Sequence, residues 1–326
     1  MATDFPVLSD QQIVSLRPQR NSVDPLKPYA FMVEEECSAS GELTKVATVF
    51  LTSSECVFRC TMCDLWKNTL EQPVKPGAIG KQIRWALNQL EIDLVAPGRQ
   101  GISAIKLYNS GNFFDNRAVP RNDWPEIVEL VAGFESVIVE NHPRLCKQNC
   151  LEFKNLLSGR LEIAMGLETV HPQVLRWLNK QMSLEDFQEA TQRLILDDIN
   201  VRAFVLLRPP FLTEQEGVYW ATKTMEYAFD CGVECCSLVP VRGGNGALDQ
   251  LQKRGNFTPP NLKSMESALA AGLGMNRGRV FMDLWDVERF VTCAACSSDR
   301  QNRILQMNQT QTVIQGDECG DCGCTR

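Results

Sequence analysis

Short β-branched runs alternate with amphipathic stretches through most of this chain, and that alternation limits the fold more than any other feature. Helical periodicity occurs at Ala78–Leu94, Asp123–Phe134, Gln148–Leu157 and Ser183–Ile199. The strands expected around these helices are Val46–Leu51, Ile102–Tyr108, Ser136–Val139, Leu161–Met165, Val201–Leu207, Glu234–Val239 and Val280–Asp283. Strand–helix alternation at this spacing predicts an α/β fold, in which outer helices cover a parallel sheet or barrel.

Two helix starts carry capping signals. Ser183 is followed three residues later by Asp186, and Thr213 by Glu216. In a capping box, each of the two side chains accepts a hydrogen bond from the backbone N–H of the other residue. We therefore expect helices to begin directly after Ser183 and Thr213.

The two ends of the chain differ from its middle. Residues 1–44 hold one short helix signal, Ser9–Arg17, and the stretch Tyr29–Glu36, which we expect to form a hairpin with the first core strand. Beyond about residue 285 the alternation stops and cysteines accumulate. The sequence thus predicts an N-terminal extension (1–44), a core (45–285) and a small cysteine-rich C-terminal segment (286–326).

Charge and hydropathy narrow the functional class. The 326 residues include 33 Lys and Arg against 40 Asp and Glu, a net charge of −7. Such a chain is not expected to bind nucleic acid through charge alone. It has no apolar run of about 18 residues, and its first residues lack the basic start and apolar stretch of a secretory signal. We expect a cytoplasmic protein that does not enter a membrane.

Cysteine is abundant and histidine is scarce. There are 14 cysteines and 2 histidines. In a cytosolic chain large enough to bury a core, clustered cysteines are more often metal ligands or catalysts than disulfide partners. Any metal site here is therefore expected to be built from thiolates.

Three cysteines stand close together directly after the first core strand, at Cys56, Cys60 and Cys63. In α/β barrels, the loops at the carboxyl ends of the strands carry the chemistry. This spacing lets three thiolates surround one face of a cubic [4Fe–4S] cluster and leaves one iron without a protein ligand. The alternatives are a zinc knuckle that lacks a ligand, or three unrelated cysteines. Structural zinc is normally four-coordinate, so it suits three thiolates poorly.

The triplet, placed after the first strand of a βα-repeat chain, resembles the radical S-adenosylmethionine superfamily. The resemblance implies a partial (βα)6-type TIM-like barrel and a [4Fe–4S] cluster whose open iron is chelated by the amino and carboxylate groups of S-adenosylmethionine. An electron, delivered by a donor such as flavodoxin or ferredoxin, then cleaves the sulfonium to methionine and a 5′-deoxyadenosyl radical. The chain departs from the superfamily at Met62, where an aromatic residue is common.

Further strand ends support the resemblance. After the second strand come Ser110, Gly111 and Asn112, where the superfamily has a glycine motif whose backbone meets the methionine ammonium group; the glutamate often found there is absent. Glu140 and Glu168 end the next two strands, and Lys180 follows twelve residues later.

This pattern is similar to the branch that contains the elongator catalytic subunit, tRNA methylthiotransferases and oxygen-independent coproporphyrinogen oxidase. By that resemblance, Glu140 contacts polar groups of the cofactor, Glu168 binds the ribose hydroxyls, and Lys180 binds the methionine carboxylate.

As a set, the segments SGNFFD, GLETVHP and LLRPPFLTE look closest to the proteins that include the archaeosine-forming enzyme acting on tRNA. This resemblance implies a modified tRNA nucleoside as substrate, reached directly or through a tRNA-binding partner protein. A small-molecule or peptide substrate remains an alternative. So do a non-catalytic iron–sulfur protein that carries electrons or scaffolds a complex, and a zinc-stabilised interaction module. The sequence identifies no residue that quenches the product radical.

A second cysteine group lies near the C-terminus, with the pairs Cys293–Cys296 and Cys319–Cys322 and the extra Cys324. Two CxxC pairs at this separation satisfy the spacing of a four-thiolate metal site, either zinc or an auxiliary iron–sulfur cluster. Cys324 either replaces Cys322 as a ligand in such a site or remains free. The other cysteines lack ligand spacing and are expected in the core.

Overall fold

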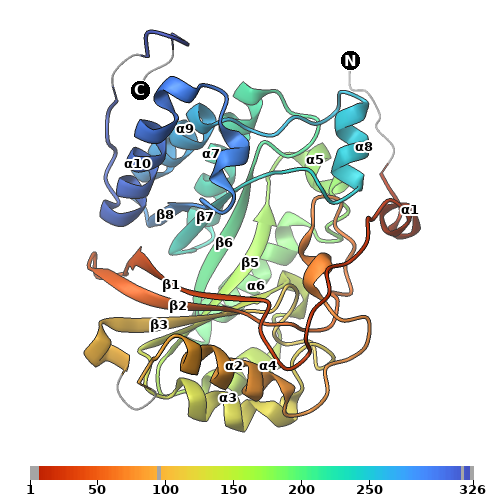
Figure 1. Cartoon of the computed structure of the whole chain (residues 1–326), viewed down its shortest axis with the longest axis vertical. Helices are drawn as coiled ribbons and strands as arrows, with labels where there is room; N and C mark the ends of the chain where they lie inside the picture. The colour runs from red at the N-terminus through yellow and green to blue at the C-terminus, as the bar shows by residue number, and fades with distance from the viewer. Residues whose placement is uncertain (1–6, 94–96, 317–318, 324–326) are drawn as a thin grey trace.

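A single eight-stranded sheet forms the centre of the computed structural model, which describes residues 7–93, 97–316 and 319–323. Its strands follow the chain order from β1 to β8 (Figure 1). The first two form an antiparallel hairpin, and every later neighbour pair is parallel. The strands are β1 (Ala30–Cys37), β2 (Leu43–Phe50), β3 (Ile102–Tyr108), β4 (Ser136–Asn141), β5 (Arg160–Glu168), β6 (Asn200–Leu207), β7 (Cys235–Pro240) and β8 (Arg279–Met282).

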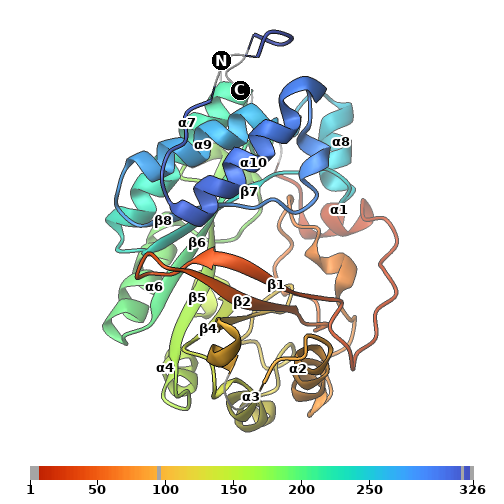
Figure 2. The same ribbon diagram turned by 60° about the vertical axis from the view of Figure 1, so that its left-hand side comes forward.

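Helices cover the outer face of the curved sheet (Figures 1 and 2). The α-helices are α1 (Asp10–Ser15), α2 (Ala78–Gln89), α3 (Trp124–Val131), α4 (Gln148–Lys154), α5 (Pro172–Trp177), α6 (Leu184–Leu196), α7 (Glu214–Asp230), α8 (Ala247–Lys253), α9 (Leu262–Gly274) and α10 (Ala294–Thr310). Short 3-10 helices occur at Leu65–Asn68, Pro97–Gln100, Arg121–Asp123, Pro143–Leu145 and Val287–Phe290.

The α/β barrel class is confirmed: the seven predicted core strands correspond to β2–β8, and the expected hairpin is β1–β2. Both predicted capping boxes form, at the starts of α6 and α7. The predicted helix at 78–94 ends earlier, at Gln89; Leu94 lies outside the described residues. The division into three parts remains a prediction.

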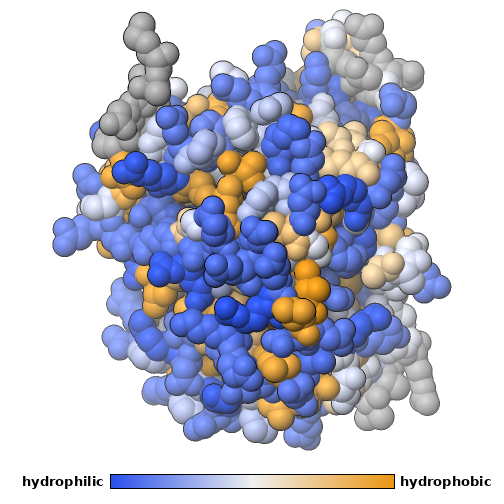
Figure 3. Space-filling model, turned by 180° about the vertical axis from the view of Figure 1, so that it is seen from behind, coloured by the Kyte–Doolittle hydropathy of each residue, from blue (hydrophilic) through white to orange (hydrophobic). Residues whose placement is uncertain are grey.

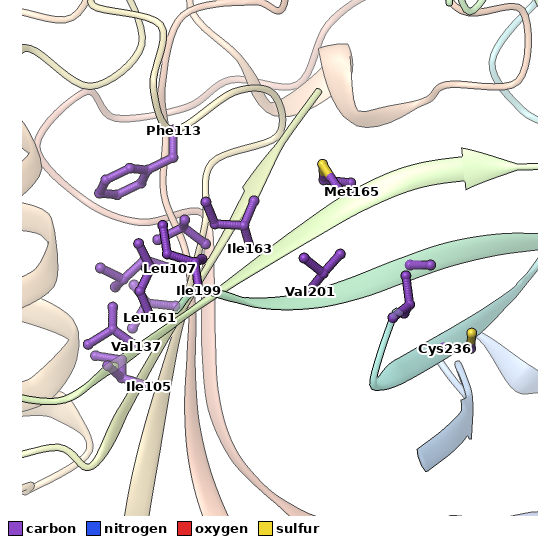
Figure 4. Close-up of a cluster of buried hydrophobic side chains, with 14 of the residues drawn as sticks. Ile105, Leu107, Phe113, Val137, Leu161, Ile163, Met165, Ile199, Val201 and Cys236 are labelled. Carbon is purple, nitrogen blue, oxygen red and sulfur yellow. The ribbon is translucent and has the colours of Figure 1, made fainter. Parts of the chain in front are cut away.

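The main core lies between the sheet and the helices. Because side chains alternate across a strand, every second residue of β2–β8 points outward against the helices. Figure 4 shows part of this layer, with Leu107 of β3, Val137 of β4, Leu161 and Met165 of β5, and Val201 of β6. These side chains are fully or almost fully buried. The cysteines without ligand spacing are also buried, as predicted; they are Cys37, Cys146, Cys150, Cys231, Cys235 and Cys236.

The opposite, inward face of the sheet carries a buried ion-pair network. Glu36 of β1 accepts from Lys106 of β3 at 2.6 Å and contacts Arg202 of β6. Arg202 also binds Glu162 of β5 at 2.5 Å. Burial alone would raise the pKa of Glu36, but the charges of Arg202 and Lys106 outweigh burial and hold that pKa well below its usual value. The network thus joins strands from opposite sides of the barrel.

Side chains also bridge the two sheet edges, β1 and β8. Arg279 of β8 donates to the carbonyl of Cys37 at 3.0 Å and lies 3.5 Å from Glu36. Gln309 of α10 donates to Glu35 of β1 at 2.9 Å. The sheet is therefore a nearly closed barrel whose open seam is spanned by polar contacts.

The surface seen from behind is mostly hydrophilic, with apolar residues in scattered patches (Figure 3). Within the described residues, no helix combines the length and apolar character needed to cross a bilayer. Helix α10 packs against α9, β1 and β8, so it extends the helical cover of the core.

Candidate active site at the carboxyl edge of the barrel

The loop with Cys56, Cys60 and Cys63 follows β2, at the carboxyl edge where the sequence predicted it. Glu55, just before the first cysteine, anchors the start of this loop. The Glu55 carboxylate binds Arg17 at 2.7 Å and Arg59 at 3.2 Å, and it also pairs with Arg20. These contacts tie the loop to the N-terminal extension.

The middle and end of the loop are anchored by backbone contacts from distant segments. Thr61 donates its N–H to the carbonyl of Leu178 at 2.8 Å. Asn245, buried in the glycine-rich loop after β7, donates to the carbonyls of Thr61 at 2.8 Å and Cys63 at 3.1 Å. Asn245 was not singled out in the sequence. Its only signal there is its place in a loop at the carboxyl end of a core strand, where α/β barrels carry their chemistry.

The three cysteines of the triplet are half-buried. Burial raises the pKa of Cys60 to about 12, and it also raises the pKa values of Cys56 and Cys63. Asn112 donates from Nδ2 to the Cys56 Sγ at 3.1 Å. Buried thiols of high pKa become thiolates when a metal supplies positive charge. Three soft donors in this setting fit an iron–sulfur cluster.

The predicted glycine motif after β3 lies beside the first cysteine. A Cβ on Gly111 would come within 3.5 Å of the Cys56 Cβ, so backbone and cysteine nearly touch. Ser110 adopts a left-handed backbone conformation, with φ of 55°, and its hydroxyl lies 2.9 Å from that of Tyr29. Tyr29 was predicted only as the start of the hairpin.

Aromatic packing fixes the position of this motif. Phe113, which follows Asn112, is fully buried and lies at one end of the core layer in Figure 4. Its ring centroid is 5.0 Å from that of Phe153 in α4 and 5.3 Å from that of Phe114. The Asn112 side chain, which donates to Cys56, thus extends from a backbone segment that is anchored in the core.

Glu140, near the end of β4, binds the backbone of the glycine motif after β3. Its Oε1 accepts the backbone N–H of Asn109 at 2.7 Å and that of Gly111 at 3.2 Å. Burial raises the pKa of Glu140 to about 7, although these backbone donors oppose the shift. In this structure Glu140 therefore shapes the turn; its predicted contact with a cofactor stays a prediction.

Glu168 and Lys180 meet in a buried ion pair, with Nζ 2.6 Å from Oε1. Burial alone would lower the pKa of Lys180, but the charges of Glu168 and Cys60 outweigh it and raise that pKa. Glu168 has a left-handed φ of 67° beside an irregularity in the β5–β6 pairing, which turns its side chain toward the site. A Cβ on Gly166 would overlap both charged groups, so the pair as it stands uses the space that glycine leaves.

His142 covers the cysteine loop, a contact that the sequence analysis missed. Its ring stacks on Phe58 with centroids 3.7 Å apart, and its Nε2 lies 3.1 Å from the carbonyl of Lys180. Its backbone N–H donates to Asn112 Oδ1 at 2.8 Å. Burial lowers the pKa of His142 to about 3, so the ring is neutral at pH 7.

The structure therefore brings the predicted residues of the first site to one edge: the triplet, Ser110–Asn112, Glu140, Glu168 and Lys180. The second predicted set is also brought together, at a separate place. The sulfurs of Cys293, Cys296, Cys319 and Cys322 all lie within 4.8 Å of one another. Cys324 lies outside the described residues.

No protein-family model matches this chain. An uncharacterised protein of Methanocaldococcus jannaschii is 22% identical over 257 residues, which are 76% of this chain and 70% of that protein. The archaeosine synthase subunit beta of Methanosarcina acetivorans is 24% identical over 314 residues, or 87% of this chain and 84% of the relative.

Among solved structures, that of Methanocaldococcus infernus Elp3 with residues 1–46 deleted has a TM-score of 0.52 at 15% identity. The match covers 70% of this chain and 59% of the Elp3 chain. This likeness shows a shared fold. The relative named archaeosine synthase subunit beta agrees with the resemblance that the sequence motifs indicated, and the shared fold is compatible with it.

Proposed function

We propose that this protein is a radical S-adenosylmethionine enzyme in which Cys56, Cys60 and Cys63 hold a [4Fe–4S] cluster. One observation carries the proposal: three half-buried cysteines share an edge of the barrel with the buried Glu168–Lys180 pair, and Thr61 of their loop donates to the carbonyl of Leu178, two residues before Lys180. A structural metal site has no need of such a pair, whereas a zwitterionic cofactor does.

The cluster would supply one electron to the sulfonium of S-adenosylmethionine, which divides into methionine and the 5′-deoxyadenosyl radical. Lys180 binds the methionine carboxylate as a point charge, and Glu168 then accepts hydrogen bonds from the ribose hydroxyls. The backbone at Gly111 receives the methionine ammonium group, flanked by Ser110 and Asn112. Glu140 holds this turn in place and contacts polar groups of the cofactor.

Two side chains shield part of the cysteine loop. Phe58 and His142 form a stacked cover, and the neutral imidazole adds no positive charge beside Lys180. A radical formed in such a site takes a hydrogen atom from the substrate, giving 5′-deoxyadenosine and a substrate radical.

For the substrate we propose a modified tRNA nucleoside. The proposal is supported by the relative named archaeosine synthase subunit beta, whose name also implies a further subunit. This chain carries a net charge of −7, so a partner protein is the better source of tRNA affinity. A flavodoxin or ferredoxin would deliver the electron. A small molecule or peptide is the alternative substrate.

Hydrogen transfer tests both the chemistry and the substrate. The reconstituted, reduced protein is incubated with S-adenosylmethionine and tRNA from cells grown in deuterated medium, and 5′-deoxyadenosine is analysed by mass spectrometry. The proposal predicts deuterium in this product for the wild type and no product for Cys60→Ala. Cys231→Ala, a buried cysteine outside both predicted sites, is the matched control and should behave as wild type. Unlabelled product alone would reject tRNA as the hydrogen donor; no product in any sample would reject the radical reaction.

A further inference from the structure

The four C-terminal cysteines come from two segments that are distant in sequence. Cys293 and Cys296 lie at the start of α10, with Cys293 as its N-cap residue. Cys319 and Cys322 belong to the tail beyond the C-terminal end of the same helix. The tail thus returns to the helix start, and Ile314 on the way packs against the main core.

The spacing of their sulfur atoms identifies the kind of centre. The Sγ atoms of Cys293 and Cys319 are 4.0 Å apart, and those of Cys296 and Cys322 are 3.9 Å apart. A disulfide requires about 2.05 Å, so these are not disulfide distances. Four thiolates at about 2.3 Å from one tetrahedral zinc ion lie about 3.8 Å from one another.

An iron–sulfur cluster needs a wider arrangement. In a four-iron cube each cysteine binds a different corner, which separates the sulfurs by roughly 6 Å. In a two-iron cluster the four thiolates divide into two pairs, and the cluster holds these pairs apart. Here all four sulfurs lie within 4.8 Å of one another. Among the described residues, no other group of three or more His, Cys, Asp or Glu side chains brings its ligand atoms this close together. The Cys56–Cys60–Cys63 triplet is less compact as well.

The electrostatic setting also suits a single ion. Four thiolates and Zn²⁺ carry a net charge of about −2. The N-terminal end of α10 places its backbone N–H groups and positive dipole at Cys293 and Cys296. A cavity of about 260 Å³ beside the cysteines is lined by Lys263 and Arg300, which add positive charge.

We propose that Cys293, Cys296, Cys319 and Cys322 bind one Zn²⁺ ion in a closed, tetrahedral four-thiolate site. All four positions around the ion are taken by protein, so the site holds structure and performs no catalysis. It fixes the C-terminal tail to the start of α10, a helix that contacts β1 and β8 at the seam of the barrel.

Metal analysis and X-ray absorption spectroscopy of the wild-type protein test this zinc site without any variant. Metal analysis of protein purified from cells should give about one zinc per chain. Extended X-ray absorption at the zinc edge should show a single shell of four sulfurs at about 2.3 Å. Nitrogen or oxygen ligands in that shell, or the absence of zinc, would overturn the proposal.

Two variants assign the metal to its cysteines. Cys319→Ser should lose zinc and keep the iron and sulfide of the triplet, whereas Cys60→Ala should lose iron and keep zinc. Cys231→Ala should keep both. If Cys319→Ser instead loses about four irons with their sulfide, the C-terminal site holds a second cluster and the proposal is wrong. Soluble wild-type protein gives the absorption result even if Cys319→Ser does not fold.

Discussion

At the scale of single residues, the site depends on buried charges that neutralise each other. Glu168 and Lys180 are both almost fully buried, and their pair links β5 to the segment after α5. The family resemblance implied that both residues are cofactor ligands, with Glu168 at the end of a strand and Lys180 twelve residues later. It did not predict that they would bind each other, since that contact depends on the backbone turn at Glu168.

Removing one member of the pair leaves the other charge buried. Lys180→Met should therefore lower the free energy of unfolding by about 3 kcal/mol, and adding Glu168→Gln should restore most of that loss. Denaturant unfolding of wild type, Lys180→Met and the double variant measures these free energies of unfolding. Equal stability of Lys180→Met and wild type would show that the pair is not buried in solution.

Gly166 offers a second, more selective test. Gly166→Ala adds a methyl group that overlaps the Glu168 carboxylate and the Lys180 ammonium, so both groups must move from their present positions. We expect the variant to reconstitute its cluster, seen by visible absorption, but to lose at least tenfold in S-adenosylmethionine affinity by equilibrium dialysis. Gly274→Ala is the control, because a Cβ there meets nothing within 4 Å. Wild-type affinity in Gly166→Ala would remove Lys180 and Glu168 from the binding site.

At the scale of elements, local sequence signals were reliable and long-range contacts were not. Ser183 and Thr213 cap their helices as predicted, because a capping box involves residues only three positions apart. Helix α10 was missed. Its buried residues Cys296, Arg300, Ile304 and Met307 form a narrow stripe with little apolar signal. The contact of Asn245 with the cysteine loop spans more than 180 residues, and no local pattern encodes it.

That contact predicts how firmly the loop holds metal. Asn245→Ala removes the donor to the Thr61 and Cys63 carbonyls and also the acceptor for the N–H of Leu248 in α8. Each lost buried hydrogen bond costs about 1–2 kcal/mol, so iron should leave the reconstituted protein roughly tenfold faster in the presence of a chelator. Absorbance decay measures the rate. Asn88→Ala, on the exposed face of α2, should match wild type; an unchanged rate in Asn245→Ala would contradict the anchoring role.

At the scale of the whole molecule, charges inside the barrel replace the missing hydrogen bonds between β1 and β8. The α/β class followed from the alternation in the sequence. The ionic interior did not, because residues such as Lys106 and Glu162 alternate with apolar ones in the same way as solvent-exposed positions. Their inward direction is set by closure of the sheet, which no single strand encodes.

The interior network predicts acid sensitivity. In the unfolded chain Glu36 takes up a proton near pH 4.5, whereas its pKa in the folded protein is held well below that value. Its contribution to stability is therefore complete above pH 4.5 and is lost as the pH falls further. Glu36→Gln should lower the free energy of unfolding by about 3 kcal/mol at pH 7, and the gap to wild type should narrow toward pH 3. Urea unfolding across this range measures both, with the exposed Glu42→Gln as control; a pH-independent gap would contradict the assignment.

The central claim is that the triplet supports reductive cleavage of S-adenosylmethionine. Its most direct test is the amount of 5′-deoxyadenosine formed when anaerobically reconstituted protein is reduced and incubated with the cofactor. The account predicts product from wild type and Cys231→Ala, with about four irons bound at the triplet, and none from Cys60→Ala. A fully reconstituted wild type that forms no 5′-deoxyadenosine, with tRNA and small-molecule candidates present, would contradict the account and favour an electron-carrying iron–sulfur protein.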